Sequence, residues 1–350
     1  MKVVHILPDF SISQAGLFYA VKGLAQFSAF ETEVWSWKFD SCDVSVKKIG
    51  LQCLVWNIFM ERSSMVAFHF HGCWSLNLFA GVLVARVLKK PIYFHPHGML
   101  SPWALSQRRI KKRVAFMLFQ GWVMCLADRI VCNSWIEQRE ISSLRGSSAR
   151  KIVCIPNGID PPRVQRVPWT RNKTLGFLSR LHEKKGIVEL ISAFSDSQLK
   201  GWQLAIGGYG HSVFVHKCEA LAKFSNKKIY FLGMVDDHMK DQFFTEIDYL
   251  VLPSLSENFG LVVAESLARG VPVLTTRHTP WVNESNIGVM EIHTDPQKLS
   301  IELSCIAIIN AEKYAAMSSE ARRYAEKFYW NNIECKYIDE YSKFLGYSPR

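Results

Sequence analysis

Two glutamates flank an abrupt change of sequence character near residue 255. An apolar run ends at Pro253, a short polar loop carries Glu257, and a helical pattern begins near Gly260 and carries Glu265. The first main-chain N–H groups of a helix have no partner inside the helix and carry roughly half a positive charge, so they bind phosphate. Carboxylates accept hydrogen bonds from sugar hydroxyls. This segment therefore combines main-chain N–H groups that can bind a phosphate with a carboxylate on either side that can bind sugar hydroxyls. The combination predicts a pocket for a nucleotide sugar.

A second loop carries two cations, Arg180 and Lys185. It follows a strand-like run at 174–178 and precedes a helical pattern that begins at Gly186. Fixed cations at this place can neutralise the charge that builds on a departing diphosphate, which stabilises the transition state electrostatically. The neighbouring Lys184 is expected to be solvated.

Three histidines follow the ends of predicted strands, namely His71, His95 and His97. Ligands of open α/β sheets bind beyond the carboxyl ends of the strands. We therefore expect His97 near the reacting groups, with His95 as the second choice, whereas hydrogen-bonded structural roles are favoured for His71 and His95. The His-x-His pattern also occurs in metal sites. No carboxylate or cysteine cluster lies nearby in the sequence, however, so no metal is assigned.

The segment from Val251 to Leu274, VLPSLSENFGLVVAESLARGVPVL, resembles the donor-site signature of glycosyltransferase family 4, whose members are retaining enzymes of the GT-B fold. The resemblance rests on the E-x7-E spacing of Glu257 and Glu265 with Asn-Phe-Gly between them. It implies that Glu265 binds the ribose hydroxyls of the nucleotide and that Glu257 binds the transferred sugar. It further implies main-chain contacts to the sugar and the diphosphate from Asn258, Phe259, Gly260, Leu261 and Val262.

The same resemblance extends to other loops. Arg180 and Lys185 match an R-L-x-x-x-K-G pattern whose cations act on the diphosphate, although Ser179 stands where the family usually has glycine. In the first loop, at 8–16, Ala15 replaces the usual first glycine and only Gly16 remains as a donor contact. The resemblance places His97 near the hydroxymethyl group of the sugar and the reaction centre. It also implies that the main chain at Gly233 and Met234 pairs with the nucleobase, and that no metal is needed.

A basic segment lies within a helix that we expect over 104–127. Its five cations are Arg108, Arg109, Lys111, Lys112 and Arg113. At 100° per residue they span roughly 200° of arc, opposite an apolar side with Ile110, Val114 and Met117. Each cation near an anionic leaflet contributes about 1 kcal/mol to the free energy of membrane binding. We therefore expect this face to bind a membrane surface or a pyrophosphate-linked acceptor. Three aromatic side chains could enter the interface, namely Phe116, Phe119 and Trp122. The alternative is a helix whose apolar side packs on its own sheet and whose basic side is merely solvated.

Short apolar runs alternate with helical patterns along the chain, which predicts an α/β fold with doubly wound parallel sheets. A stretch rich in Pro, Asn and Gly at 156–162 interrupts the alternation. We therefore expect two Rossmann-like domains that face a central cleft, as in the GT-B fold. The boundaries are 1–165 for an acceptor-side domain, 166–328 for the nucleotide-sugar donor domain, and 329–350 for a C-terminal helix that packs back toward the N-terminal domain. A break at Trp330 divides the last helical segment, 311–344.

Composition narrows the class of protein. The 350 residues are 49 % hydrophobic and 21 % charged, which is ordinary for a soluble globular protein and excludes general disorder. The net charge of +11 favours an anionic partner. No apolar run reaches the ~20 residues that span a bilayer, so we expect a cytoplasmic protein, peripheral on the inner face of the cell membrane. Nine cysteines without a C-x-x-C pair argue against disulfides and zinc and predict reduced, mostly buried thiols.

The resemblance implies a retaining, metal-independent hexosyltransferase without a cofactor. Its partners would be a UDP- or GDP-sugar, a glycan or lipid-linked acceptor of bacterial surface-polysaccharide synthesis (O antigen, capsule or lipopolysaccharide), and an anionic membrane surface. No carboxylate pair suited to double displacement is present, so Glu257 is interpreted as a sugar binder and not a nucleophile. Two alternatives stay open. A GT-B sugar-nucleotide epimerase would need no separate acceptor. A nucleic-acid binder is disfavoured because Lys and Arg concentrate on one helix and in one loop, so no nucleic-acid partner is expected.

Overall fold

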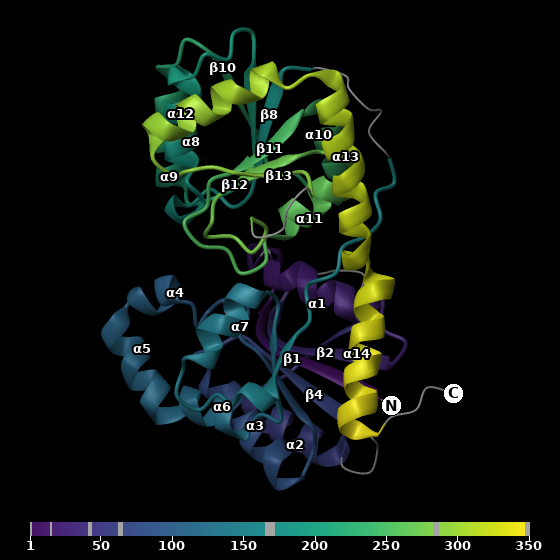
Figure 1. The fold of residues 1–350 in the computed structure, drawn as a ribbon. Helices are drawn as coiled ribbons and strands as arrows, with labels where there is room; N and C mark the ends of the chain where they lie inside the picture. Colours follow the sequence, from purple (N-terminus) through teal and green to yellow (C-terminus); the bar gives the residue numbers. More distant parts are fainter. Residues whose placement is uncertain are drawn as a thin grey trace. The chain divides into compact units, whose positions relative to one another are not determined.

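The computed structural model describes residues 2–14, 16–40, 44–61, 66–164, 172–282 and 287–346. The chain forms two compact units (Figure 1), the first from residues 1–158 and 330–350 and the second from residues 159–329. Each unit contains one parallel sheet covered by helices, so the prediction of two Rossmann-like domains is confirmed. The predicted boundary between residues 165 and 166 lies outside the described residues. The units are described separately below.

The first unit is built on a seven-stranded sheet with the strand order β3-β2-β1-β4-β5-β6-β7, in which the pairs are parallel. Its strands are β1 (Lys2–Phe10), β2 (Glu31–Phe39), β3 (Val46–Lys48), β4 (Val66–His71), β5 (Ile92–His95), β6 (Arg129–Cys132) and β7 (Ile152–Cys154). Its longer helices are α1 (Gly16–Gln26), α2 (Leu51–Met60), α3 (Leu76–Val87), α7 (Trp135–Ser142) and α14 (Trp330–Leu345). Two 3-10 turns, η1 (Ile12–Gln14) and η4 (Ala149–Lys151), complete the connections.

The two faces of this sheet differ in chemistry because successive side chains of a strand point to opposite sides. One face is apolar, with Val4, Phe68 and Phe94 in a buried cluster that also contains residues of α2 and α3. The other face carries Val3, Ala67, Tyr93 and Val131, which α14 covers. On the α14 side the strands also bear buried histidines, since His5, His69 and His95 follow two residues after Val3, Ala67 and Tyr93.

The segment expected as one helix over 104–127 is divided, so that prediction is wrong. It comprises α4 (Pro102–Ser106), α5 (Arg109–Ala115), a π-helical turn η3 (Phe116–Gln120) and α6 (Gly121–Leu126). The break has a local cause: Gln107 is extended, and Arg108 adopts a left-handed conformation with φ of 52°. The strand β3 and the helix α2 were not anticipated.

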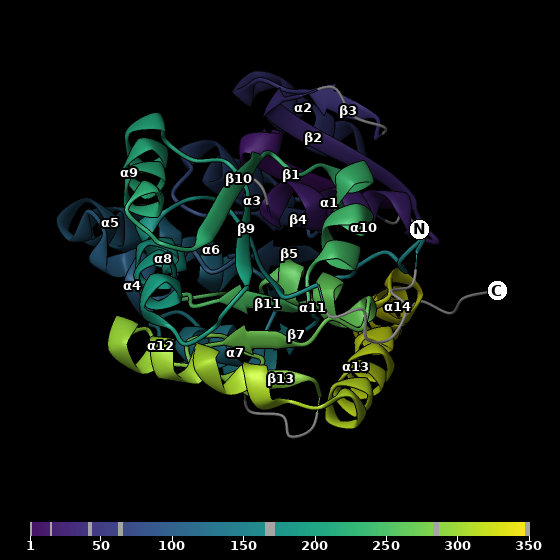
Figure 2. The same cartoon turned by 90° about the horizontal axis from the view of Figure 1, so that it is seen from above.

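The second unit contains a six-stranded sheet with the order β10-β9-β8-β11-β12-β13. Its strands are β8 (Thr174–Leu178), β9 (Gln203–Gly207), β10 (Lys228–Gly233), β11 (Tyr249–Leu252), β12 (Val273–Thr275) and β13 (Val289–Glu291). Its helices are α8 (Ile187–Asp196), α9 (Ser212–Lys223), α10 (Asp237–Glu246), α11 (Leu261–Ala268), α12 (Pro296–Cys305) and α13 (Ala311–Ala325), with short turns η5 (Glu183–Lys185), η6 (Ile306–Ile308) and η7 (Glu326–Phe328). Figure 2 shows α8, α9 and α12 on one side of this sheet and α10, α11 and α13 on the other.

The cysteines correct one expectation from the sequence. Of the eight described cysteines, three are buried (Cys73, Cys132 and Cys218) and five are exposed, so the thiols are not mostly buried. All eight are free thiols. The exposed set includes Cys53 in α2 and Cys335 in α14.

Candidate functional site

The strand order of the second unit reverses between β8 and β11. These strands are neighbours in the sheet, although β9 and β10 separate them in the sequence. In open α/β sheets, ligands bind beyond the carboxyl ends of the strands at such a reversal. The loop that follows β8 carries Arg180 and Lys185, and the loop that follows β11 carries Glu257. The fold therefore brings together the two loops that the sequence analysis selected.

A glycine fixes the distance between these two loops. Gly186 has φ of +69°, and a Cβ atom there would lie 2.2 Å from the carbonyl oxygen of Pro253. Leu255 N donates to Lys184 O at 2.8 Å, which joins the same two segments. As a result, the Lys185 ammonium forms an ion pair with the Glu257 carboxylate.

The environment of Glu257 keeps its carboxylate ionised. Its side chain is only 9 % exposed, and its Oε1 also accepts a hydrogen bond from Ser254 Oγ at 3.0 Å. Burial raises the pKa of Glu257, but the charges of Lys185 and Lys184 and these hydrogen bonds outweigh burial, so the pKa lies below its usual value. Arg180, by contrast, is exposed, and among the described residues no ion pair involves it. The site thus combines a buried, paired charge with a solvent-facing cation.

The start of α11 offers main-chain donors beside this pair. Gly260, the residue before the helix, has φ of 77°, and no side chain caps the helix. Phe259 is buried against Trp281, whose Nε1 donates to Phe259 O, so the main chain is anchored at this point. Any contact of Phe259 with a ligand would therefore use its main chain. Asn258, Leu261 and Val262 are half-buried.

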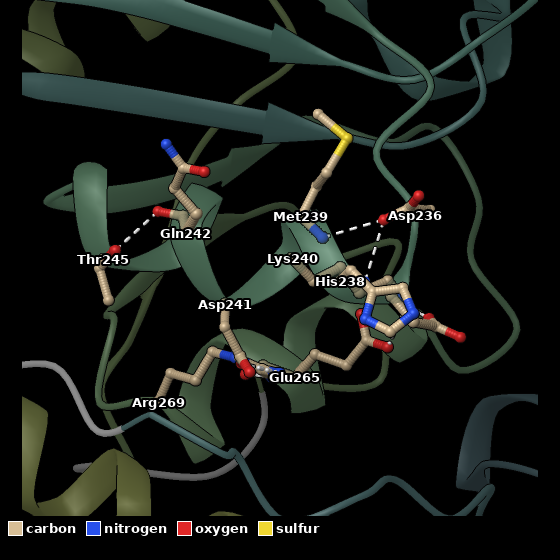
Figure 3. A network of polar contacts seen from close by, with 10 residues as sticks. Asp236, His238, Met239, Lys240, Asp241, Gln242, Thr245, Glu265 and Arg269 are labelled. Atoms are coloured by element: carbon tan, nitrogen blue, oxygen red, sulfur yellow. Dashed lines mark hydrogen bonds and ion pairs between the residues drawn. The ribbon is translucent and has the colours of Figure 1, made fainter.

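Glu265 is held by a residue that the sequence analysis missed. Its Oε1 lies 2.7 Å from the Nζ of Lys240 in α10, and Lys240 also pairs with Asp237 at 3.1 Å. Figure 3 shows Glu265 of α11 and Arg269, the residue directly after this helix, directed toward α10, where Arg269 bonds to Asp241. A sequence signal was available, because Asp236 caps α10 and sets Lys240 one turn into the helix.

Main-chain hydrogen bonds join the remaining loops at this edge of the sheet, and two of these loops contain glycines. Gly208 N donates to Gly233 O at 2.7 Å, and Leu181 N donates to Tyr209 O at 2.7 Å, so the loops after β8, β9 and β10 are joined by their main chains. Gly233 has φ of +69° with open space where a Cβ would lie. Met234 is exposed beside it.

The histidines of the first unit lie at the ends of β4 and β5. His97 is half-buried with φ of 51°, and its Nε2 lies 2.8 Å from His71 Nδ1. Burial lowers the pKa of His97 to about 4, so its imidazole is neutral at neutral pH. His95 is fully buried within β5, and its Nε2 lies 2.8 Å from His69 Nδ1.

A buried carboxylate supports the His97 loop and was also missed. Glu137 accepts from Gly98 N at 2.5 Å and from Asn133 N at 2.7 Å. The signal was the Ser134-x-x-Glu137 pattern, which is typical of a capping box at the start of a helix. At the other predicted loop, Gly16 is exposed and begins α1, while Ala15 lies outside the described residues.

Known sequence families match most of this chain. Residues 54–163 match the family Glycosyltransferase Family 4, and residues 163–323 match the family Glycosyl transferases group 1. The chain carries glycosyltransferase domains. The group 1 domain contains both loops of the reversal point, with Arg180, Lys185 and Glu257, and also Glu265.

Relatives of these glycosyltransferase domains act on varied substrates. D-inositol 3-phosphate glycosyltransferase of Acidothermus cellulolyticus is 26 % identical over 254 residues, which cover 65 % of this chain and 56 % of the relative. The match thus spans a little over half of that protein. The structure of Anabaena HepE in complex with UDP and glucose superposes with a TM-score of 0.80 at 17 % identity, covering 98 % of this chain and 100 % of HepE. WaaG, a glycosyltransferase involved in lipopolysaccharide biosynthesis, superposes with a TM-score of 0.70 at 15 % identity over 97 % of this chain and 99 % of WaaG. These superpositions establish the GT-B fold.

The basic segment of the family 4 domain presents apolar side chains to solvent. Ile110 is 80 % exposed and Met117 is 67 % exposed, and Val114 is exposed as well. The alternative that this side packs on its own sheet is therefore wrong. Of the five cations, Lys112 is engaged by the chain itself, since it donates to Ala104 O and lies 5.6 Å from the Trp74 ring centroid.

The aromatic residues of this segment are not equivalent. Phe119 is buried and Phe116 packs against the core of the unit, whereas Trp122 is exposed. The suggestion that all three enter an interface is therefore wrong for Phe116 and Phe119. Within the described ranges, no helix has the length and apolar character needed to cross a membrane.

Proposed function

We propose that this chain transfers a hexose from a nucleoside diphosphate sugar, with UDP or GDP as the nucleotide, to a hydroxyl of a growing glycan with retention of anomeric configuration. The observation that carries the proposal is the Lys185–Glu257 ion pair beside the uncapped start of α11 at the strand-order reversal. A cation, main-chain donors and a hydroxyl-binding carboxylate at one place suit a diphosphate joined to a sugar. The UDP and glucose in the HepE complex support a nucleotide sugar as the partner.

Each residue then has a distinct task. Lys185, Arg180 and the N–H groups at the start of α11 stabilise the charge on the departing diphosphate, and Glu257 orients the sugar through its hydroxyls. The acceptor hydroxyl attacks the anomeric carbon on the leaving-group face, and its proton passes to an oxygen of the departing phosphate. No protein nucleophile is required.

Glu265→Gln tests nucleotide binding. The variant removes the charge that would accept hydrogen bonds from the ribose, and hydrogen bonds to charged groups are strong, so we expect the dissociation constant of the nucleotide to rise about 10- to 100-fold. Isothermal calorimetry with UDP, GDP and ADP measures it and also selects the nucleotide. Asp237→Asn is the matched control, because it removes the other carboxylate that pairs with Lys240 and should change the affinity less than about threefold.

Two results would contradict the assignment. If the wild type and the Glu265→Gln variant bind the nucleotide with equal affinity, Glu265 does not contribute to nucleotide binding. Conversion of the sugar nucleotide to an isomer without any acceptor would favour an epimerase over a transferase.

We further propose that the acceptor is lipid-linked, as in bacterial surface-polysaccharide synthesis, and that the protein is cytoplasmic and meets the membrane through its basic segment. Arg109, Lys111 and Arg113 alternate there with the exposed Ile110 and Val114. Cations beside exposed apolar side chains complement an anionic leaflet in both charge and hydrophobicity. The role of WaaG in lipopolysaccharide biosynthesis supports this class of acceptor.

Replacing Ile110 and Met117 together by serine is expected to abolish most vesicle binding, because each exposed side chain would otherwise bury apolar area in the interface at about 25 cal/mol per Å². Co-sedimentation with phosphatidylglycerol vesicles measures the bound fraction, and binding by the wild type should fall as salt is raised. Phe224→Ser is the control, since it removes an exposed aromatic side chain from the second unit. Wild-type binding to RNA but not to vesicles would exclude the membrane proposal.

A further inference from the structure

Five histidines form one cluster on the α14 side of the first sheet. His5 and His69 are register partners on β1 and β4, and His71 and His95 are register partners on β4 and β5. His97 follows two residues after His95. The rings of His71 and His95 are stacked, with centroids 4.3 Å apart.

Two hydrogen-bonded chains run through the cluster. In the first, His5 Nδ1 lies 2.8 Å from His71 Nε2, and His71 Nδ1 lies 2.8 Å from His97 Nε2. In the second, Tyr341 Oη lies 2.8 Å from His69 Nε2, and His69 Nδ1 lies 2.8 Å from His95 Nε2. The second chain ends at His95 Nδ1, a buried nitrogen with no hydrogen-bond partner. Buried polar atoms of this kind call for a ligand, because nearly all others are satisfied.

The donor atoms that this cluster could offer to a ligand are imidazole nitrogens. A neutral imidazole offers a lone pair to a metal without first losing a proton. Nitrogen ligands of this type suit zinc, copper and nickel.

We propose that His71, His95 and His97 form a binding site for one divalent transition-metal ion, with zinc as the probe. One nitrogen of each of the three lies within 4.8 Å of one nitrogen of each other. His71 Nδ1 and His97 Nε2 face each other, and a zinc ion with bonds of about 2.0–2.1 Å requires them to separate by only about half an ångström. The third residue of the group is His95, whose Nδ1 has no hydrogen-bond partner.

The neighbouring triad His5, His69 and His71 also satisfies the distances. It is the poorer site because it lacks His95, whose Nδ1 is the one unpartnered buried nitrogen among the described imidazoles, and because both nitrogens of His69 are engaged, one by Tyr341 and one by His95. These residues instead orient the ligands. When His95 and His71 bind through Nδ1, their Nε2–H groups donate to His69 and His5, which is the outer-shell arrangement that fixes ligating histidines.

A buried carboxylate supports the loop that carries His97. Glu137 accepts a hydrogen bond from the main-chain N–H of Gly98, the residue directly after His97. His97 itself keeps φ of 51°, a left-handed conformation that the surrounding structure must maintain and that turns its side chain toward His71. The sequence analysis assigned no metal because it saw no acidic or cysteine cluster; the fold supplies imidazoles from separate strands.

The test uses the full chain without a histidine tag, freed of metal by a chelator. Calorimetric titration with zinc should give one site per chain with a dissociation constant at or below about 1 μM. His95→Phe and His71→Gln should each weaken binding about 100-fold or more, whereas His216→Gln, which changes an exposed histidine of the second unit, should leave it unchanged. Thermal midpoints establish that each variant is folded.

X-ray absorption of the zinc-loaded wild type provides a measurement that does not depend on variants. Three imidazole nitrogens around zinc would support the site. The proposal is overturned by zinc coordinated mainly by oxygen, by absence of a one-to-one site, or by unchanged affinity in a folded His95→Phe variant. Because the readout is binding and not sugar transfer, its outcome is independent of the proposed function.

Discussion

Replacing Lys185 by methionine is expected to lower the turnover number about 10²- to 10³-fold, the usual loss when one preorganised charge-stabilising group is removed. Methionine keeps most of the side-chain length and removes the charge. The departing diphosphate then loses one of the two cations proposed to stabilise it. Release of nucleoside diphosphate from the donor sugar, followed with a coupled assay, measures the effect.

The same substitution also leaves the Glu257 carboxylate buried without its partner, which by itself destabilises a protein by about 3–5 kcal/mol. The double variant Lys185→Met/Glu257→Gln separates the two effects. It should recover much of the lost stability, because no uncompensated charge remains, but none of the turnover. Lys184→Met is the neighbouring control and should retain turnover within about threefold. A Lys185→Met variant that is folded and nearly as active as the wild type would refute the assigned role.

Gly186→Ala is expected to destabilise the second unit by more than about 3 kcal/mol. The new Cβ would lie 2.2 Å from Pro253 O, in contact with main chain that cannot rotate away. The left-handed conformation adds a further cost of about 1–2 kcal/mol. Chemical denaturation of the wild type and the variant measures the free energy of unfolding.

Gly233→Ala is a matched control for this prediction, because Gly233 has the same φ of +69° but open space around its Cβ position. The free energy of unfolding of this variant should fall by about 1–2 kcal/mol, which is the cost of the left-handed conformation alone. The difference between the two variants therefore isolates the contact between the loops after β8 and β11. If both variants lose the same free energy, that contact does not determine the geometry of the site.

Sequence reasoning located the second unit well, for physical reasons. The strand 174–178 was predicted with its observed bounds, since it is a short apolar run between turn-forming residues. Glu257 and Lys185 were selected from separate loops, and the strand-order reversal brought them together. Their pairing was not predictable, because it depends on the approach of Gly186 to Pro253, which no local pattern encodes.

The first unit shows where such reasoning fails. His5 was not selected at all, because a single histidine in an apolar strand reads as an ordinary buried residue. Its proximity to His71 follows from the register of β1 against β4, which is a property of the sheet and not of either segment. Likewise, the continuous helical pattern of the segment 104–127 gave no sign of the left-handed conformation of Arg108, which divides it.

The membership of α14 in the first unit has a consequence for biosynthesis. The helix follows the whole second unit in the sequence, yet it covers the sheet face that carries Val3, Tyr93 and Val131. During translation, residues 159–329 are complete before α14 emerges from the ribosome, although domains usually fold in order from the N-terminus. The sheet of the first unit is synthesised earlier, so the face that α14 covers stays exposed to solvent until this helix has been made. A nascent chain stalled before Tyr341 would therefore be a natural client for chaperones.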